Sequence, residues 1–565
     1  MSERIFIGVA WPYADGPLHL GHIAGAYLPP DIFARYHRTK GNEVLMVSGS
    51  DQHGTPITIQ AEQEGKTPAE IASKYHQQFL DSWQKLGISF DLFTNTGTAN
   101  HTEVSSDIFR NLLDKGYIYK SIVSQPFCPN CQRFLPDRYV EGTCPYCGAS
   151  GTRGDQCDEC GKPLNASELI SPQCRQCGTT PQFKDSEHFF LKLTAFEDKL
   201  LNWVRDQGHW RTDVLNFTLR YLEEGLKDRA ITRDINWGIP LPLDGYEGKR
   251  LYVWFEAVIG YLSATKEWAK SKGDDEKWRS FWQGDVKSYY FIGKDNIAFH
   301  TIIWPAMLMG YGNLNLPYDV PANEFLTIEG RKLSTSRNWA VWLPDYLSRY
   351  DPDPLRYLLS INMPETSDTD FSWREFIRRN NNELVATYGN LVHRVLTFTY
   401  RNFNGCVPTY DDMGAPNKVP PMDNKDVRLD NMSIAAFNLV GERVAHCHFR
   451  EAIRSAMSLA QEANRYLDEK SPWKVIKEDR QAAATSLYVA LCIISRLKTM
   501  LYPFLPFSSQ KLHAFLGFEG SVEDDGWQSH LPLPGQKLLP PEPLFSKLDE
   551  GLVEEETSQL GQTHL

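Results

Sequence analysis

The chain has 565 residues, which is too many for one hydrophobic core and predicts about three or four domains. It is 41% hydrophobic and 23% charged, with no uncharged apolar run of about 18 residues and no charged-then-apolar leader, so we expect a cytoplasmic protein outside the membrane. The formal net charge of −12 excludes a general attraction to nucleic acid, so a nucleic-acid partner must bind a local basic surface.

Residues 1–116 have the pattern of a parallel α/β sheet. An apolar, β-branched strand is predicted over residues 4–10, followed by the Pro/Gly-rich loop WPYADGPLHLGH and a helix that runs to about Arg38. A second strand, EVLMVS, ends at GSDQHG. Strand, loop, helix and strand at this spacing are typical of the start of a parallel sheet.

The rest of the chain divides by pattern. Residues 117–230 break into turns and paired cysteines, which predicts an inserted domain. The α/β pattern resumes over residues 231–322, so we expect one sheet built from two separated halves. A connecting region, residues 323–380, carries the segment GRKLSTS, and residues 381–540 contain long amphipathic stretches that predict a helix bundle. The polar tail, residues 541–565, is expected to be loosely ordered.

Eight of the 11 cysteines form four Cys-x-x-Cys pairs. In a cytosolic chain this spacing indicates metal binding rather than disulfides, and four thiolates close one tetrahedral zinc site, so eight predict two structural ions. Sequential pairing would join the first pair with the second, whereas nested pairing would join the two inner pairs and the two outer ones. The pairs are Cys128/Cys131, Cys144/Cys147, Cys157/Cys160 and Cys174/Cys177.

Two polar segments far apart in the sequence are suited to a nucleotide. His19-Leu20-Gly21-His22 stands where a helix begins, and its free N–H groups and dipole favour an anion. Two imidazoles can donate hydrogen bonds as charge develops on phosphate oxygens. The loop Gly330–Ser336 combines glycine, hydroxyls and two bases, with Lys332 available to departing pyrophosphate. Each segment alone is compatible with incidental histidines or an ordinary polar loop, but the pair in this order is far more specific.

These two segments resemble the HIGH and KMSKS signatures of class I aminoacyl-tRNA synthetases. Together with the neighbouring segments GSDQHGTP, YVWFEAVIGY and FIGKDNIAFHTIIWPAML, they resemble the methionyl-tRNA synthetase family over about residues 4–515. The resemblance implies an α/β fold class: a Rossmann-like parallel-sheet catalytic domain, split by a zinc-knuckle insertion and followed by an α-helical anticodon-binding bundle. It also implies a ligase that forms methionyl-adenylate from L-methionine and ATP with Mg²⁺, then charges tRNA(Met). A monomer is expected.

The resemblance also implies roles for individual residues. The catalytic residues would be His19, His22 and Lys332. The ATP site would comprise His19, Gly21, His22, Gly293, Asp295, Lys332 and Ser334. The methionine site would comprise Ala10, Trp11, Tyr13, Asp51, Trp254, Tyr261, His300 and Trp304. Within it, Asp51 would bind the α-ammonium group through a charge-assisted hydrogen bond. Without the resemblance, ordinary core packing would be the favoured interpretation of the aromatic residues.

In the helical region the resemblance points to three residues that read the anticodon. Asn390 and Arg394 are four apart and share a helix face. Trp473 follows Pro472 at a helix start, where an exposed indole can stack on an unpaired base. Taken alone, these would be a solvated charge and a packing residue. Local phosphate contacts are expected from Arg374, Arg378 and Arg379.

The resemblance favours the nested cysteine pairing, because single-zinc relatives resemble the inner two pairs. Two positions depart from the family pattern. Thr335 replaces the second lysine of KMSKS, with Arg331 or Arg337 as candidates to supply the lost contact. Val258 stands where many relatives carry proline.

Other protein classes share some of these features but fit the sequence less well. Class I synthetases for leucine, isoleucine or valine usually carry an editing insertion larger than residues 117–230, and the cysteine enzyme places zinc in its amino-acid pocket. A non-catalytic tRNA-binding relative is disfavoured by the intact HLGH, Asp51 and Lys332. A zinc-ribbon nucleic-acid-binding protein leaves the two α/β halves unexplained.

Overall fold

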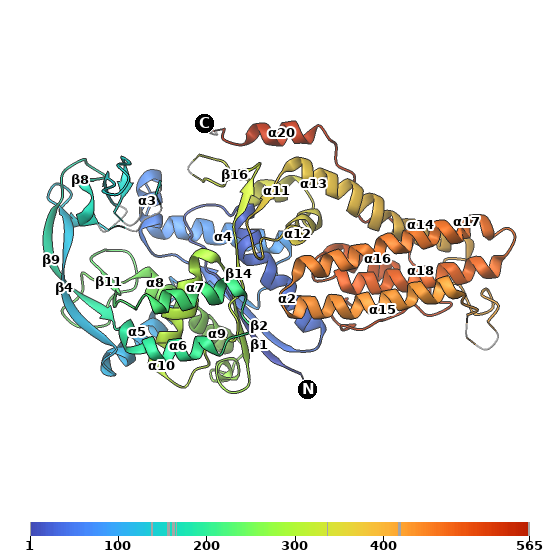
Figure 1. Ribbon diagram of the computed structural model, residues 1–565, viewed down its shortest axis with the longest axis horizontal. Helices are drawn as coiled ribbons and strands as arrows, with labels where there is room; N and C mark the ends of the chain where they lie inside the picture. Colours follow the sequence, from blue (N-terminus) through green and yellow to red (C-terminus); the bar gives the residue numbers. More distant parts are fainter. Residues whose placement is uncertain are drawn as a thin grey trace.

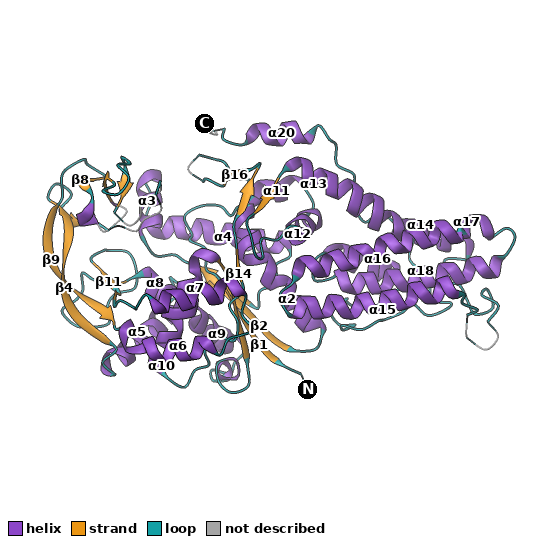
Figure 2. Ribbon diagram, in the orientation of Figure 1, coloured by secondary structure: helices purple, strands orange, loops and turns teal. Residues whose placement is uncertain are grey.

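The structure is a computed structural model that describes residues 2–136, 139–154, 157, 159–160, 164, 166–335, 337–415, 418 and 420–562. Figure 1 shows an elongated molecule in which an α/β body lies at one end and a bundle of long helices at the other. Figure 2 shows that strands are confined to the α/β body and the part beside it, whereas the opposite end is helical.

A parallel sheet of five strands lies at the centre of the α/β body. Their spatial order is β14 (Ala322–Asn323), β13 (Lys287–Gly293), β1 (Arg4–Val9), β2 (Glu43–Ser50) and β3 (Leu92–Asn95). Ile5 of β1 lies opposite Lys287 on one side and Val44 on the other. The two halves that are separated in the sequence therefore form one sheet, as predicted.

Helices cover both faces of this sheet. Alternate residues of β1 point to opposite faces. Ile5, Ile7 and Val9 pack with α2 (Leu28–Thr39) and α4 (Pro68–Leu86). Phe6 packs with the helices of the other face, which are α5 (Ala99–Asp114), α9 (Gly260–Ser271) and α10 (Trp304–Tyr311). Strands buried on both faces explain why the sequence shows nearly continuous apolar runs here.

The insertion is built on a long antiparallel ribbon. β4 (Ile118–Cys128) pairs with β9 (Gln182–Leu191) along its whole length. The tip carries a small sheet of β7 (Thr152–Arg153), β6 (Val140–Thr143) and β8 (Ile170–Cys174). It has a small hydrophobic core of its own, into which cysteines of all four pairs pack. Two helices, α6 (Glu197–Arg205) and α7 (Thr212–Glu223), lead back to the sheet.

The bundle consists of long helices after the α/β body. They are α14 (Asn390–Asn402), α15 (Asn424–Ala445), α16 (Phe449–Lys470) and α18 (Arg480–Leu501), with the short α17 (Pro472–Val475) and α19 (Pro506–Phe515). In the described part of the chain, α18 is the one helix long and apolar enough to cross a membrane, but 94% of its apolar window is buried. It therefore has the character of the core helix of the bundle.

The described part of the C-terminal tail, residues 541–562, contains a docked helix, so the expectation of a loose tail is wrong for these residues. Its helix α20 (Leu552–Gln559) lies over α11 (Leu343–Arg349) and α13 (Trp373–Arg379), away from the bundle (Figure 1). Glu556 is only 3% exposed; it pairs with Arg349 and accepts a hydrogen bond from Tyr350 Oη at 2.5 Å. The local sequence is polar and gives no indication of these partners, which stand about 200 residues earlier.

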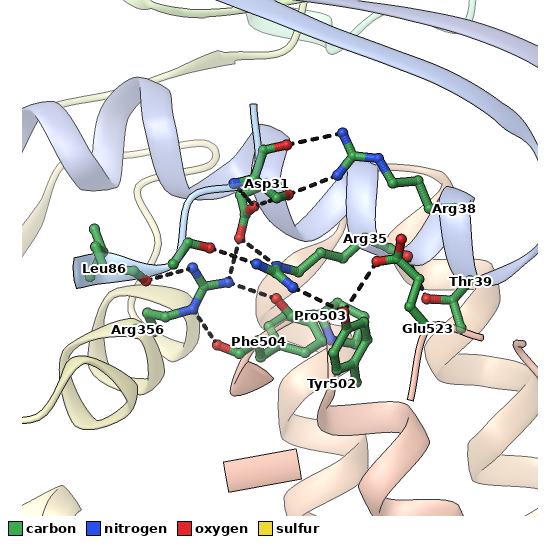
Figure 3. A network of polar contacts seen from close by, with 12 residues as sticks. Asp31, Arg35, Arg38, Thr39, Leu86, Arg356, Tyr502, Pro503, Phe504 and Glu523 are labelled. Atoms are coloured by element: carbon green, nitrogen blue, oxygen red, sulfur yellow. Dashed lines mark hydrogen bonds and ion pairs between the residues drawn. The ribbon is translucent and has the colours of Figure 1, made fainter. Parts of the chain in front are cut away.

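A buried ionic network joins the α/β body to the bundle (Figure 3). Arg356 of α12 (Pro352–Ile361) is fully buried, and its Nη2 lies 2.7 Å from Asp31 Oδ2 in α2. The same guanidinium donates to the carbonyls of Pro503 and Phe504, in the turn that follows α18. Burial alone would raise the pKa of Asp31, but Arg35 and Arg356 outweigh it and lower that pKa to about 2. Asp31 is therefore a charged partner at neutral pH.

Candidate functional site

The two histidines of HLGH form a reciprocal pair at the start of α1 (Leu20–His22). The backbone N–H of each donates to the ring Nδ1 of the other, at 3.2 and 3.3 Å, and the rings stack with centroids 3.6 Å apart. Burial lowers the pKa of His22 to about 4 and that of His19 well below its ordinary value. Both imidazoles are therefore neutral at pH 7, and because Nδ1 accepts, each carries its hydrogen on Nε2 as a donor.

The KLSTS loop lies directly beside HLGH. A Cβ atom built on Gly21 would be 3.2 Å from a methyl carbon of Leu333. The chain after the loop runs along HLGH, where the N–H of Leu20 donates to Val341 and that of Leu343 donates to Leu18. Two segments that stand far apart in the sequence are thus in contact, which is the arrangement the pair of signatures predicts.

The loop extends a hairpin of β15 (Leu326–Ile328) and β16 (Arg331–Lys332). Ser334 and Trp339 close it with two backbone hydrogen bonds of 2.9 and 3.1 Å. Lys332 is exposed, and the Arg331 guanidinium stacks on the Trp339 ring at 4.6 Å. Arg337 is exposed, while Ser336 lies outside the described residues.

The other predicted ATP residues follow β13. Gly293 ends this strand and Asp295 comes two residues later. Because β13 runs parallel to β1, its carboxyl end lies at the same edge of the sheet as the loop that leads into HLGH. This edge is where open α/β sheets bind ligands. Burial raises the pKa of Asp295.

Aromatic residues gather at this edge. The Trp11 ring fits against two glycines, since a Cβ atom on Gly49 would lie 2.3 Å from it and one on Gly260 would lie 2.7 Å from it. Trp254, which is 42% exposed, donates from Nε1 to Tyr13 Oη at 2.9 Å. Ala10 follows β1, and its N–H donates to the carbonyl of Phe291.

Deeper in the body, Tyr261 and His300 form a buried pair. His300 Nδ1 donates to the carbonyl of Asn296 at 2.9 Å, and burial lowers the pKa of His300 to about 4. Its Nε2 therefore accepts the hydroxyl hydrogen of Tyr261, with 2.8 Å between the atoms. Trp304 is fully buried behind them; it donates to Tyr290 Oη, and the Tyr290 ring packs against Tyr261. Core packing thus accounts for the surroundings of Trp304.

Asp51 is a buried carboxylate at the end of β2. It is 3% exposed, and its Oδ1 accepts the backbone N–H of His53 at 3.1 Å. Burial, and then the nearby Glu256, raise the pKa of Asp51 well above its usual range. A cationic ligand group would compensate this buried carboxylate, as the predicted α-ammonium would.

The eight cysteines form two tetrads in the nested pairing. The outer tetrad is Cys128, Cys131, Cys174 and Cys177, and the inner one is Cys144, Cys147, Cys157 and Cys160. The recorded sulfur–sulfur contacts are 3.4 to 3.9 Å. Four sulfurs around zinc, each at about 2.3 Å, would be about 3.8 Å apart, so both tetrads fit the ion.

Local backbone geometry explains the glycines of these motifs. Gly148 and Gly178 follow the second cysteine of a pair and adopt positive φ angles of 77° and 71°. Each donates its N–H to the carbonyl of the first cysteine, at 3.0 and 2.7 Å. Glycine takes this left-handed conformation without strain, which closes the turn around the two sulfurs.

Comparisons with known proteins agree along the whole chain. The family model described as tRNA synthetases class I (M) matches residues 5–396, and the anticodon binding domain of methionyl tRNA ligase matches residues 425–564. The chain is 65% identical over 561 residues to the methionine–tRNA ligase of Dehalococcoides mccartyi, covering 99% of this chain and 100% of the relative. It is 53% identical to that of Thermomicrobium roseum, covering 99% of both.

A solved structure agrees as well. Mycobacterium tuberculosis methionyl-tRNA synthetase in complex with methionyl-adenylate is 25% identical, with a TM-score of 0.79 over 96% of this chain and 100% of the other. The chain belongs to the methionyl-tRNA synthetase family of class I. Membership in this family sets aside the synthetases for other amino acids and the zinc-ribbon interpretation.

The residues expected to read the anticodon belong to α14 and α17, two helices of the bundle, on the side of the molecule away from the insertion (Figure 1). The Arg394 guanidinium stacks over the Trp473 ring at 4.2 Å and its Nη2 lies 3.3 Å from Asp468. Asn390 is exposed one turn earlier on the same helix. Two arginines expected to contact phosphate, Arg378 and Arg379, are ion-paired with Glu375 and Glu383.

Sequence reasoning missed a buried carboxylate in this member of the methionyl-tRNA synthetase family. Glu256 is fully buried and accepts hydrogen bonds from His53 and His101, at 2.7 and 2.6 Å. His53 and Glu256 stand in the segments GSDQHGTP and YVWFEAVIGY, but the resemblance assigned roles only to other residues of these segments. His101 stands in α5 outside every quoted motif.

Proposed function

We propose that this chain is a methionine–tRNA ligase. It activates L-methionine with ATP to methionyl-adenylate and pyrophosphate, then transfers methionine to the 3′-terminal adenosine of tRNA(Met). The observation that carries this proposal is the contact between HLGH and the KLSTS loop at the sheet edge that also holds Asp51 and Trp11.

In the activation step the protein positions the reactants and stabilises charge. Asp51 binds the α-ammonium group, and the aromatic residues at the sheet edge enclose the thioether side chain. The methionine carboxylate then attacks the α-phosphorus of ATP in line and expels pyrophosphate. His19 and His22 donate their Nε2 hydrogens to phosphate oxygens as charge develops, and Lys332 stabilises the departing pyrophosphate. ATP brings Mg²⁺, which neutralises phosphate charge.

The zinc ions have a structural role in this proposal. Four thiolates fill the coordination sphere at each tetrad, so neither site keeps a position for a substrate. The metal supports the insertion, which lies over the acceptor end of tRNA. Asn390, Arg394 and Trp473 read the anticodon at the other end of the molecule. The enzyme acts as a cytoplasmic monomer.

The proposed domain division follows the pattern changes of the sequence. It is supported by β4, which starts the ribbon at Ile118, and by α14, which starts at Asn390. The units are the two catalytic halves 1–116 and 231–322, the connective insertion 117–230, the stem-contact region 323–380, the anticodon-binding bundle 381–540 and the tail 541–565.

Amino-acid-dependent exchange between pyrophosphate and ATP tests the proposal. Each of the twenty amino acids is supplied in turn to the purified, zinc-loaded chain, and exchange is expected with methionine alone. Charging of tRNA(Met) with labelled methionine then tests the transfer step. Exchange with a different amino acid, or with none, would refute the proposed function.

A further inference from the structure

The Glu256 carboxylate joins two segments from different parts of the catalytic body. It belongs to α8 (Val253–Glu256), and its two oxygens accept from His53, just after β2, and from His101, in α5. All three side chains are almost fully removed from solvent. A buried carboxylate is tolerated only when its charge is paired and its oxygens are hydrogen-bonded, so Glu256 depends on both imidazoles and they on it.

One arm of this cluster reaches the Asp51 carboxylate. The ring of His53 is held by Glu256, and its backbone N–H donates to Asp51 Oδ1 at 3.1 Å. The other side of the His53 ring meets Trp237 edge-on, with centroids 5.7 Å apart, and Trp237 Nε1 donates to the carbonyl of Gln52. The segment that presents Asp51 is therefore fixed both by its backbone and by the ring of His53.

The second arm reaches the Trp11 ring and the glycines against which it packs, which we call the Trp11 wall. His101 Nδ1 lies 2.8 Å from Ser263 Oγ, which donates to the carbonyl of Gly260 at 3.1 Å. Gly260 is one of the glycines against which the Trp11 ring packs, and the Trp11 ring lies 6.2 Å from that of His101. The cluster thus connects the Asp51 carboxylate to the segment against which the Trp11 ring packs.

We propose that Glu256 is a positioning residue for the amino-acid substrate: through its two histidines it fixes the Asp51 carboxylate relative to the Trp11 wall. An α-amino acid has its ammonium group and side chain on one carbon, so the spacing between their two partners determines how well both bind at once. This inference rests on the proposed function. It concerns binding of the amino acid and predicts no change in the handling of ATP.

The test is Glu256→Gln, which keeps the shape but replaces one acceptor oxygen by an amide that faces an imidazole donor. We expect the KM for methionine in pyrophosphate exchange to rise about tenfold to a hundredfold, as for loss of one charge-assisted hydrogen bond. The KM for ATP should stay within about twofold, because no hydrogen bond or ring contact joins the cluster to HLGH or to the loop residues that the structure describes. Glu267→Gln is the matched control, since it removes a carboxylate of α9 that accepts only from Thr94 in this structure's recorded hydrogen bonds.

A purely structural role predicts a different result. If Glu256→Gln raised both KM values together, or lowered the unfolding temperature without changing the KM for methionine, the proposal would be overturned. Should this variant fail to fold, Ser263→Ala decides, because it leaves Glu256 and both imidazoles in place and removes the far hydrogen bond of His101 together with the bond from Ser263 to Gly260. It must raise the KM for methionine several-fold and leave that for ATP unchanged, and an unchanged KM for methionine would overturn the proposal.

The wild-type chain separates this inference from the proposed function. If it activated another amino acid, the proposed function would fail, while the same variants would still test the positioning role through the KM of that amino acid.

Discussion

Gly49 leaves the space that the Trp11 ring occupies. A Cβ atom there would lie 2.3 Å from the ring and 2.5 Å from the carbonyl oxygen of Thr94, which belongs to the neighbouring strand and cannot easily withdraw. We expect Gly49→Ala to lower the free energy of unfolding by about 1–3 kcal/mol, as overpacking does. It should also raise the KM for methionine more than that for ATP.

Urea unfolding and exchange kinetics measure these two effects. Gly208→Ala is the control, because a Cβ atom on Gly208 would meet nothing within 4 Å. Equal stability of Gly49→Ala and the wild type would mean that the Trp11 ring does not hold this position in solution.

Single residues also mark the limit of prediction from sequence. His19, His22 and Lys332 were predicted because each stands in a contiguous motif whose residue types suit phosphate. Glu256 was not, because its partners stand 203 and 155 residues away and no periodicity links them. The nested arrangement of the cysteines was favoured through resemblance, since the spacing alone allowed two pairings.

At the scale of elements, the segment that follows α20 contacts the end of the KLSTS loop. The carbonyl of Asn338, at the end of this loop, accepts the N–H of Gly561, and the Asn338 amide donates to the carbonyl of Gln562 at 2.5 Å. Glu556 anchors α20, the helix that precedes Gly561 and Gln562. Its substitution should therefore loosen the KLSTS loop.

We expect Glu556→Gln to weaken this docking by about 1–3 kcal/mol, since an amide then faces the Arg349 guanidinium. Hydrogen exchange of residues 333–341 should accelerate and kcat for exchange should fall. Glu555→Gln, the exposed neighbour, should change neither. Unchanged hydrogen exchange in Glu556→Gln would show that the tail does not restrain the loop.

The two cysteine tetrads share no residue, so we expect each to bind its zinc ion independently of the other. Because Cys144 and Cys157 share a tetrad, Cys144→Ser combined with Cys157→Ser should reduce bound zinc from two ions per chain to one. Elemental analysis of the purified protein measures this ratio. Cys128→Ser with Cys174→Ser should remove the other ion, and loss of both ions from either variant would contradict independent sites.

The local sequence predicted element types better than their docking. A parallel sheet and a helix bundle follow from the strand and helix patterns, which are properties of neighbouring residues, but the number of strands in the sheet does not. The position of α20 did not, because Glu556 looks like a solvated charge until Arg349 and Tyr350 are brought to it by the fold.

Across the whole molecule, Arg356 joins the catalytic body to the bundle, because it pairs with Asp31 of α2 and donates to the carbonyls of Pro503 and Phe504. Asp31→Asn should lower the free energy of unfolding by about 3–5 kcal/mol, because it leaves the Arg356 guanidinium buried without its counter-charge. Glu43→Gln, which breaks the exposed pair with Arg4, should change stability by less than about 1 kcal/mol. Chemical denaturation at pH 7 compares the two.

The same pair gives a pH dependence. The pKa of Asp31 is about 2 in the folded chain and about 3.9 when unfolded, so its contribution is complete above pH 4 and is lost as the pH falls towards 2. Asp31→Asn should remove this part of the acid destabilisation. If both proteins lost stability equally over that range, Asp31 would not be the group responsible.

The proposed function assigns anticodon reading to the bundle and methionine activation to the sheet edge, so we expect the two steps to be separable. Trp473→Ala should reduce kcat/KM for charging of tRNA(Met) about tenfold to a hundredfold, as for one lost base stack, and leave methionine-dependent exchange unchanged. With a tRNA whose anticodon is substituted, the variant and the wild type should perform alike. Unchanged charging of tRNA(Met) would refute the anticodon assignment.

The order of strands in the central sheet also determines when the sheet can be completed during translation. β1 has β2 on one side, which follows it closely in the sequence, and β13 on the other. Lys287 of β13, which pairs with Ile5 of β1, is translated about 280 residues after it. At about 5–20 residues per second, the ribosome leaves that edge of β1 open for roughly 14 to 60 s. An open strand edge invites pairing with other chains. Nascent copies of this protein therefore need shielding until β13 arrives, and only then can HLGH meet the loop that completes its site.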